Sequence, residues 1–472
     1  MNLYLLSPEL SLLALALVVI LLDLFVTQKR VLAVVAVGGL IVPVAFTIAL
    51  WGVQATTFNG MLVVDEFALF FKLLFMGCAA LVILSSVDYV VKFRAFQGEY
   101  YALVLLAAVA MMLTAATGEL ISIYLALEMS NLALYALSGF LKDRKSSEAG
   151  LKYLLLGAVA SAVFLYGMAL IYGITGTTHL AEIAAAIPAG GLAANPALLM
   201  GVAMLVAGFG FKIATVPFQM WIPDVYEGAP TPITAYLSVA SKAAGFAVIL
   251  RVFYVALGPV SLDWSTIFAV LAAITMTLGN VVAIAQRNIK RMLAYSSIAQ
   301  AGYIMMGLAA VTAVGQSALL FFLAAYALTN LGAFIAIIAI SGKTDSDEIA
   351  DYSGMWRRAP LITLALALCL ISLTGIPPTA GFMAKVYIFS AAVDYGLAWL
   401  VVVAVINTAI SAYYYLRVVR VMFLGAPASE EAVPSSGALR AALSIACAGV
   451  LILGVFPWLL LQVAESAAGL FS

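Results

Sequence analysis

Four ionisable side chains lie deep inside apolar stretches of this sequence: Glu128, Lys212, Lys242 and Lys385. The stretches are long enough to cross a bilayer, and a charged side chain at the centre of a spanning helix costs about 2.5–3.5 kcal/mol on insertion scales. Ionisable residues kept inside a membrane at such a cost usually handle ions or protons. We therefore expect these four residues to carry the chemistry of the chain by handling ions or protons, rather than to serve only in packing.

The composition identifies a membrane protein with many spans. The 472 residues are 65% hydrophobic and 9% charged, with a mean hydropathy of +1.16, whereas soluble domains are about 45–50% apolar. A spanning helix needs about 20 residues, and the polar and Gly/Pro breaks leave about fourteen such stretches. We expect an all-α polytopic fold with transmembrane helices over 8–27, 31–52, 64–87, 99–117, 119–141, 149–174, 197–223, 230–257, 264–286, 289–311, 314–341, 360–392, 395–423 and 437–464.

The seventh and twelfth of these spans contain sequence that ordinary helices avoid. The seventh reads IATVPFQMWIP over 213–223, and the twelfth reads SLTGIPPTAG over 372–381. Proline removes a helical donor and clashes with the preceding turn, so both helices should be discontinuous. In lipid, such backbone is tolerated only where protein covers it or where it lines a wet cavity. Lys212 precedes the first break and Lys385 follows the second.

Corresponding broken helices in two halves of a transporter are the best sequence indication of an ion site built from inverted repeats. We therefore expect a single transmembrane domain over 1–472. Within it, the N-terminal helices occupy 1–98, two inverted five-helix repeats occupy 99–257 and 264–423, and a last helix occupies 437–464. Two unrelated proline kinks are the alternative.

Basic residues indicate how the chain is oriented. Of the 22 Lys and Arg, all but six lie in or beside alternate loops, for example at Lys142 and Arg357. The positive-inside rule places these loops in the cytoplasm and both termini on the opposite side, together with His179. One cytoplasmic connection, between spans seven and eight, carries Asp224 and Glu227 and no basic residue. We expect a contact, a proton entrance or a solvated turn there.

Nucleotide and metal sites have no support in the sequence. Cys78, Cys369 and Cys447 are isolated, without a CxxC spacing or a nearby histidine. There is no Walker motif, and the GxG of Gly208 and Gly210 lies inside an apolar helix without the rest of a dinucleotide fingerprint. We expect this chain to bind neither ATP nor NAD and to ligate no zinc or iron–sulfur cluster.

Several motifs together resemble one family. The stretch PFQMWIPDVYEGAPTP over 217–232, followed by AYLSVASK over 235–242, is similar to the signature of the antiporter-like subunits of respiratory complex I, and its VYEGAPTP part is most similar to the subunit N type. LEMSNLALYAL from Leu127, IKRMLAYSSIAQAGY from Ile289 and GIPPTAGFMAK from Gly375 extend the resemblance over essentially the whole chain. Subunits of multisubunit cation/proton antiporters and membrane hydrogenases share the general pattern, but this wording favours complex I.

The resemblance implies roles for particular residues. It assigns proton transfer to Glu128 in LEMS, Lys212 before the first break, Lys242 in SVASK and Lys385 in GFMAK, and secondary relay positions to Lys152 in AGLKYLLLG and Lys290 in NIKRMLAYSS. This chain has glutamine at Gln219 and Gln300, where family members often carry histidine. Because glutamine cannot titrate, any protonic role of those histidines must pass to water or be dispensable.

Glu128 and Lys212 would then form a switch. Burial disfavours the charged form of lysine, whereas a nearby carboxylate favours it. A change of a few ångströms in their separation alters the Coulomb energy by about 1 kcal/mol or more at an effective dielectric of about 20. Lys242, about twelve residues into the eighth span, would hold the proton next, and Lys385 would exchange it with the non-cytoplasmic side. A structural ion pair and a snorkelling Lys385 are the alternatives.

Other polar residues of the predicted spans have two interpretations each. The tenth span carries five polar side chains that could support a proton relay through water or could only form hydrogen bonds with neighbouring helices. They are Tyr295, Ser296, Ser297, Gln300 and Tyr303. Asp23 and Lys72 could form a pair between early helices, although structural roles are favoured. Arg251, near the end of the eighth span, is expected to snorkel.

The resemblance implies a proton-translocating membrane subunit of NADH:quinone oxidoreductase in a bacterial plasma (inner) membrane, driven by quinone reduction in partner subunits. It implies no redox cofactor in this chain, because FMN, iron–sulfur clusters and quinone belong to those partners. The implied partners are the other membrane subunits of complex I, including neighbouring antiporter-like subunits, the lipid bilayer and protons, with no nucleic acid. A subunit of a cation/proton antiporter or membrane-bound hydrogenase would purify without these redox partners. A structural spacer would tolerate neutral lysine substitutions.

Overall fold

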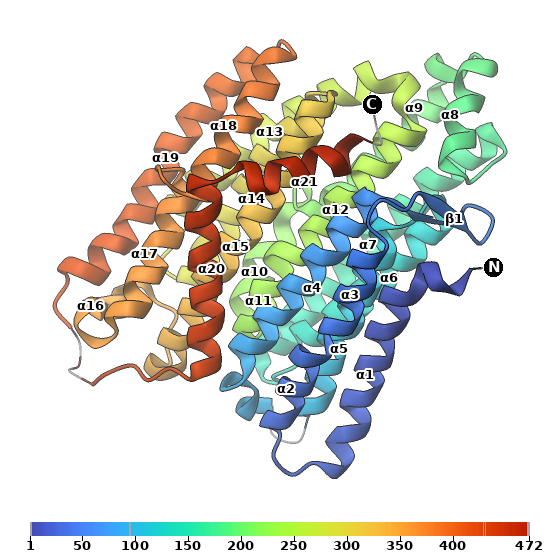
Figure 1. Ribbon diagram of the computed structural model, residues 1–472. Coiled ribbons are helices and arrows are strands. Elements are labelled where there is room, and N and C mark those ends of the chain that lie inside the picture. The colour runs from blue at the N-terminus through green and yellow to red at the C-terminus, as the bar shows by residue number, and fades with distance from the viewer. Residues whose placement is uncertain (1, 94–95, 428, 430, 470–472) are drawn as a thin grey trace.

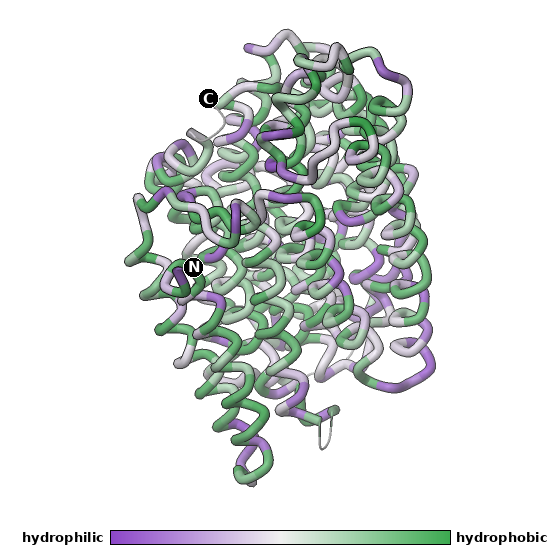
Figure 2. The backbone as a smooth tube through the Cα atoms, turned by 90° about the vertical axis from the view of Figure 1, so that its right-hand side faces the viewer, coloured by the Kyte–Doolittle hydropathy of each residue, from purple (hydrophilic) through white to green (hydrophobic). Residues whose placement is uncertain are grey.

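The computed structural model describes residues 2–93, 96–427, 429 and 431–469, without the side chains of 262 and 263. Apart from one short hairpin, its regular structure is helical, and most helices lie side by side in one tilted bundle (Figure 1). Hydrophobic residues dominate the helices, and hydrophilic residues gather at many of the turns between them (Figure 2). The all-α polytopic fold predicted from composition is confirmed.

The described helices have the following bounds. They are α1 (Ser7–Phe25), α2 (Arg30–Gly39), α3 (Ile41–Ala49), α4 (Glu66–Ser86), α5 (Gln97–Ala115), α6 (Leu120–Ser138), α7 (Arg144–Thr175), α8 (Leu180–Ala189), α9 (Pro196–Ile213), α10 (Trp221–Gly228), α11 (Thr231–Tyr236), α12 (Lys242–Leu250), α13 (Ser261–Ile284), α14 (Ile289–Ala309), α15 (Ala313–Thr344), α16 (Met355–Arg358), α17 (Pro360–Thr374), α18 (Ala380–Asp394), α19 (Ala398–Leu424), α20 (Gly437–Val455) and α21 (Trp458–Ala468).

Twelve helical segments of the described chain are long and apolar enough to cross a membrane. Two predicted spans lie outside that set for visible reasons. Helix α14 carries Lys290 and Arg291 in its first turn and contains many polar residues after them. The span predicted over 360–392 is divided into α17 and α18, which have 15 residues each. With these two added, the helices follow the predicted order of spans.

Two spans form the centre of the bundle. One is the segment Thr231–Ala256, in which α11 and α12 alternate with π-helical turns at Leu237–Ser241 and Arg251–Ala256. The other is α15, of which nearly every residue is buried. A helix that is apolar on all sides can be surrounded by other helices, so these segments are covered by protein rather than by lipid.

Both predicted breaks are present. Helix α9 ends at Ile213, and after the left-handed Ala214 (φ 60°) the chain makes a short 3₁₀ turn before α10. Helix α17 ends at Thr374, followed by Gly375 at φ 91° and then α18. A residue in the left-handed region ends a helix because its backbone can no longer continue the helical path.

Two main-chain clasps tie loops together at opposite ends of the bundle. In the first, Leu120 N–H donates to the Thr178 carbonyl (2.9 Å) and Leu180 N–H to the Gly118 carbonyl (3.1 Å). In the second, Ile289 N–H donates to the Asp347 carbonyl and Ile349 N–H to the Arg287 carbonyl, both at 2.8 Å. Each clasp joins the start of one helix, α6 or α14, to the segment that follows a 32-residue helix, α7 or α15.

The ends of the chain add two features that the sequence did not predict. Strands β1 (Ala55–Thr57) and β2 (Leu62–Val64) form an antiparallel hairpin after α3, with Ala55 opposite Val64. The helix predicted over 437–464 stops at Val455, because Pro457 has no N–H to continue it. Helix α21 then crosses the bundle, packing on α15 and α4 (Figure 1).

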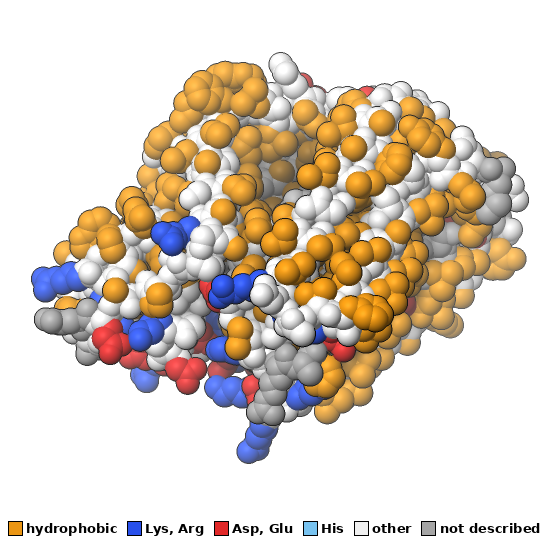
Figure 3. Space-filling view, turned by 60° about the horizontal axis from the view of Figure 1, so that its bottom comes forward, with side chains coloured by type: hydrophobic (Ala, Val, Ile, Leu, Met, Phe, Trp, Pro, Cys, Tyr) orange, Lys and Arg blue, Asp and Glu red, His pale blue; other side chains and the backbone are white. Residues whose placement is uncertain are grey.

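Lysine and arginine side chains gather at one end of the bundle, which we call the basic face and define by Lys29, Lys142, Arg291, Arg357 and Arg440. Figure 3 shows this end, with basic and acidic side chains along its rim and hydrophobic side chains covering the walls above. The first clasp lies at the opposite end, and the second lies at the basic face. The clustering of charge matches the alternation of basic loops seen in the sequence.

Candidate functional site

Lys212 lies at the end of α9, one residue before the helix ends, and it is 4% exposed. The backbone freed by the break is satisfied by protein. Thr215 N–H donates to the Gly210 carbonyl (2.9 Å), and Val216 N–H donates to the Thr275 hydroxyl (3.0 Å). Because its polar groups are paired, this irregular backbone can persist inside a membrane.

Asn131 lies between Glu128 and Lys212 in a chain of hydrogen bonds. The Lys212 ammonium donates to Asn131 Oδ1 (2.6 Å) and to the Ser130 hydroxyl (3.2 Å). Asn131 Nδ2 in turn donates to Glu128 Oε1 (3.1 Å), which also accepts from the Ser161 hydroxyl (2.5 Å). The lysine and the carboxylate are therefore coupled through an amide. They do not form a direct ion pair, neither the one predicted as a switch nor the structural one given as its alternative.

Lys242 is 2% exposed and begins α12 at its junction with the π-helical turn Leu237–Ser241. Its ammonium donates to the carbonyl and to the hydroxyl of Ser297 on α14, both at 2.6 Å. The phenol of Tyr226 lies 3.4 Å from the same hydroxyl. π-Helical turns occur often at functional sites, and here one places the lysine against another helix in the core.

Lys385 points back toward the end of the broken helix α17. Its ammonium donates to the carbonyls of Thr374 (2.8 Å) and Leu373 (3.3 Å) and to the Thr408 hydroxyl (3.4 Å), and it lies 4.6 Å from the centre of the Tyr303 ring. The last carbonyls of a helix lack helical partners, so the break supplies these acceptors. The snorkelling alternative is wrong, because Lys385 is 4% exposed within the protein.

Helix α14 connects the surroundings of Lys242 with those of Lys385. Ser297 accepts from Lys242, and Gln300, three residues on, donates to the Leu373 carbonyl at 3.1 Å. Lys385 donates to that same carbonyl. A cavity of about 10 Å³ borders Gln300 and Lys385, close to the volume that one water needs. The predicted polar row on this span thus lies between two of the candidate lysines.

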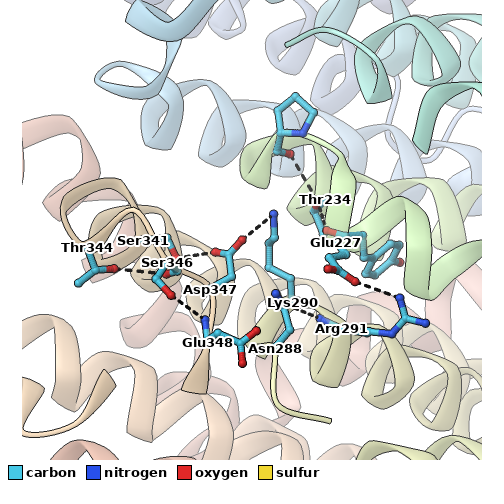
Figure 4. Close-up of polar contacts among 12 residues, drawn as sticks. Glu227, Thr234, Asn288, Lys290, Arg291, Ser341, Thr344, Ser346, Asp347 and Glu348 are labelled. Carbon is cyan, nitrogen blue, oxygen red and sulfur yellow. Dashed lines mark hydrogen bonds and ion pairs between the residues drawn. The ribbon is translucent and has the colours of Figure 1, made fainter. Parts of the chain in front are cut away.

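The two relay candidates lie at the basic face and are paired with carboxylates. Lys152, with 41% of its side chain exposed, contacts both Glu148 and Asp224 at 2.8 Å. Lys290 is nearly buried and contacts Asp347 at 3.0 Å (Figure 4).

Asp224 and Glu227 both lie on α10. Arg291 contacts Asp224 (2.8 Å) and Glu227 (3.0 Å), so α10 is tied to α14. Figure 4 shows the contact with Glu227. Through Lys152, Asp224 also ties α10 to α7. Of the interpretations open for this acidic segment, the structure favours the contact.

Asp23 pairs with Lys29 (2.7 Å), and Lys72 pairs with Glu9 (2.7 Å). These two residues therefore do not pair with each other, and their contacts suit the structural roles that were favoured for them. The prediction that Arg251 snorkels is wrong. Arg251 is 5% exposed, and both terminal nitrogens donate to the Asp65 carboxylate at 2.6 Å. These partners lie up to 186 positions apart, so only the arrangement of the helices could reveal them.

Asn131 is the residue of this hydrogen-bond chain that the sequence analysis missed. A signal was present, because Asn131 stands three positions after Glu128 in LEMSN, and residues three apart share a face of a helix. Gln219 and Gln300, at the histidine positions, behave differently from each other. Gln300 bonds to the Leu373 carbonyl, whereas the buried Gln219 Oε1 has no hydrogen-bond partner among the described residues.

Comparison with known proteins agrees with this architecture. Residues 117–411 match the family described as NADH:quinone oxidoreductase/Mrp antiporter, TM. The chain is 52% identical to NADH-quinone oxidoreductase subunit N of Dehalococcoides mccartyi, over 98% of each chain. It is 44% identical to the subunit N of Trichlorobacter lovleyi, over 99% of this chain and 97% of that one.

Solved structures share the fold over nearly the whole chain. A chain of respiratory complex I from Thermus thermophilus with bound aureothin has a TM-score of 0.81 and 34% identity, with 96% of this chain and 98% of that chain covered. A chain of the Mrp complex from Dietzia sp. has a TM-score of 0.87 at 23% identity, over 99% and 97%, and this likeness shows the fold alone.

A membrane bundle with two broken helices and a buried lysine at each defines the class of antiporter-like membrane subunits. Within that class, the chain belongs to the NADH-quinone oxidoreductase subunit N family, the proton-translocating antiporter-like membrane subunits of respiratory complex I. It is therefore a multi-pass subunit of a NADH:quinone oxidoreductase that works together with other subunits. The resemblance seen in the sequence is confirmed.

Proposed function

We propose that protons cross this subunit by way of Glu128, Lys212, Lys242 and Lys385. The observation that carries the proposal is that each of the three lysines is buried and, among the described residues, its ammonium donates hydrogen bonds only to uncharged oxygen atoms. Burial disfavours an ammonium group that has no counter-ion. Such a lysine can release its proton at a small change in its surroundings.

The ion pair of Lys72 with Glu9 shows the contrast. Lys72 is as deeply buried, yet its ammonium lies 2.7 Å from a carboxylate. Removing a proton from such a pair would leave an uncompensated buried charge, which costs several kcal/mol. Lys72 therefore suits a fixed structural role, and the three lysines that lack a direct carboxylate partner suit transfer.

Glu128 would set the state of Lys212 through Asn131. When the Glu128 carboxylate is charged and Asn131 bridges it to Lys212, the ammonium form of Lys212 is favoured. When the hydrogen bonds of Asn131 break, this electrostatic stabilisation of the ammonium weakens. Moving one proton against 100 mV costs about 2.3 kcal/mol. Changes at partner subunits, driven by quinone reduction, must therefore change the free energy of protonation at this site by at least that amount. Lys152 and Lys290, held by carboxylates at the basic face, would deliver protons toward the buried lysines.

The two halves of the chain are proposed to be inverted repeats, over 99–257 and 264–423, flanked by 1–98 and 437–464. The clasps support this division, because the same pair of main-chain hydrogen bonds occurs at equivalent helices but at opposite ends of the bundle. The breaks support it too, since both follow a helix that ends in the left-handed region.

We further propose that the basic face lies in the cytoplasm, with both termini on the other side of a bacterial plasma membrane, and that FMN, iron–sulfur clusters and quinone are held by partner subunits. Cysteine labelling in intact cells tests the orientation. A cysteine at Lys142 should react only after permeabilisation, whereas one at His179 should react from outside. Labelling of both from one side would contradict the proposed topology.

Proton uptake by membrane vesicles that contain the assembled complex tests the main proposal. Lys212→Ala should depress pumping and coupled quinone reduction, while assembly and electron transfer to a ferricyanide-type acceptor remain. Normal pumping in an assembled Lys212→Ala complex would remove this lysine from the path.

A further inference from the structure

A groove separates the first helix of the second break from the last long helix. It has a volume of about 500 Å³ and runs between α17 and α20. Leu361, Leu364, Leu443 and Leu451 are among the apolar residues along its walls, and Arg358 and Arg440 lie at its end on the basic face. This groove takes no part in the proton path described above.

The basic end of the groove is built to hold an anion. Arg358 is 9% exposed, and its Nε donates to the Glu431 carbonyl (2.8 Å). Arg440 forms no ion pair with any described residue. The N-termini of α17 and α20, which follow Ala359 and Ser436, lie at the same end and add a partial positive charge.

One carboxylate nearby must be considered. Glu431 carries a negative charge, but Lys343 contacts it at 2.8 Å, and this hydrogen bond and charge lower the pKa of the Glu431 carboxyl. The lysine therefore balances that carboxylate, and, among the residues that the structure describes, the two arginines leave an excess of positive charge at the end of the groove. A ligand with a negative head is the charge complement of this end.

The length of the groove indicates what the rest of the ligand is. From Arg440 to Leu451 the wall follows eleven residues of α20, which corresponds to about 16 Å at about 1.5 Å per residue. One leaflet of a bilayer has about half of the roughly 30 Å hydrocarbon thickness. The apolar part of the groove thus matches an acyl chain that starts at the headgroup level.

We propose that this groove binds one anionic phospholipid, with its phosphate between Arg358 and Arg440 and an acyl chain along α17 and α20. Basic pockets between spanning helices are a known way for membrane proteins to hold anionic headgroups. Such a lipid would cover the part of α17, the first helix of the second break, that lines the groove.

Photolabelling of the assembled complex in vesicles tests this proposal. Delipidated complex is placed in phosphatidylcholine vesicles that contain a trace of a photoreactive phosphatidylglycerol or of a matched photoreactive phosphatidylcholine. After illumination, labelled peptides of this subunit are measured by mass spectrometry. The phosphatidylglycerol probe should label α17 and α20 in preference to the phosphatidylcholine probe. Equal labelling by the two probes would overturn the proposal.

Variants of the groove sharpen the test. Arg358→Gln and Arg440→Gln should each lower phosphatidylglycerol labelling about fivefold, and Arg357→Gln, a neighbour that does not line the groove, should leave it unchanged. Ala365→Phe, which fills the apolar part, should also lower labelling and decides the matter if the arginine variants fail to assemble. Unchanged labelling in Ala365→Phe, or a helix of a neighbouring subunit in the groove in a map of the complex, would contradict a bound lipid.

Discussion

The two broken helices place a lysine in the core by the same backbone device but surround it differently. At the first break, Lys212 contacts a side-chain amide that leads to the Glu128 carboxylate. At the second, Lys385 contacts the last carbonyls of α17 and an aromatic ring. A distant carboxylate can be moved or neutralised, whereas carbonyls at a helix end are fixed. The comparison teaches that the first break suits control and the second suits exchange.

The largest expected effect is the loss of Lys212 or Glu128. Either Ala variant should lower proton pumping by the assembled complex at least about tenfold, because a positioned proton-transfer group contributes about 10²–10⁴-fold. Proton uptake by vesicles measures this effect. Lys29→Ala, which removes a basic-face lysine paired with Asp23, is the control and should pump normally. Equal pumping by all three variants would end the assignment of control to the first break.

Substitutions of Lys385 test the exchange role of the second break. Lys385→Ala should impair pumping, and Lys385→Arg should do no better, because a guanidinium does not lose its proton in proteins. Lys385→Glu should keep part of the activity, since a carboxylate can also exchange protons. Vesicle assays of the three variants give the ranking. If the Arg form pumps like the unchanged protein, Lys385 acts only as a fixed charge.

Substitutions of Asn131 test this comparison directly, because in the described part of the chain Lys385 donates to no side-chain amide as Lys212 does. Asn131→Leu should uncouple Glu128 from Lys212 and lower pumping severalfold. Asn131→Asp should place a carboxylate in direct contact with the ammonium, hold its proton and lower pumping further at neutral pH. The pH dependence of pumping distinguishes the two.

Ser138→Ala is the matched control for Asn131, because Ser138 is buried on the same helix and donates only to the Leu134 carbonyl (2.7 Å). It should pump like the unchanged protein. Identical pH profiles for Asn131→Leu, Asn131→Asp and the unchanged protein would show that the amide has only a packing role.

The smallest effects should come from the residues that end the two helices. Gly375→Ala puts a side chain at φ 91°, at a cost of about 1–2 kcal/mol, and its Cβ would lie 2.9 Å from Lys385 Cδ. Ala214→Gly should be nearly neutral, because relief of the left-handed strain at φ 60° is offset by the flexibility of glycine. Thermal unfolding of the assembled complex compares the two variants. If the two variants lost equal thermal stability, the dihedral angles at the two helix ends would not account for their strain.

Much of the fold could be predicted because it follows from local sequence. Apolar runs of bilayer length gave the spans, and proline with glycine gave the breaks beside Lys212 and Lys385. The candidate lysines stood out because charge is costly in lipid. Each of these signals lies within one helix, so no knowledge of helix packing was needed.

What could not be predicted depends on contacts between distant helices. The partner of Lys72 is Glu9, the partner of Arg251 is Asp65, and the bridge from Lys212 to Glu128 is Asn131. Many side chains could satisfy a buried cation, and sequence spacing does not choose among them. The turn into α21 was missed for a different reason, since a single proline in an apolar run is also compatible with a kinked span.

The two clasps have a consequence for the order of events during synthesis. The first clasp is complete once Leu180 has left the ribosome, before the break after Ile213 is made, and the second is complete at Ile349, before Gly375. Chains emerge and fold from the N-terminus onward. In each half, the long helix and its neighbours are therefore tied together in advance, and the irregular segment enters the membrane beside protein that is already in place to cover it.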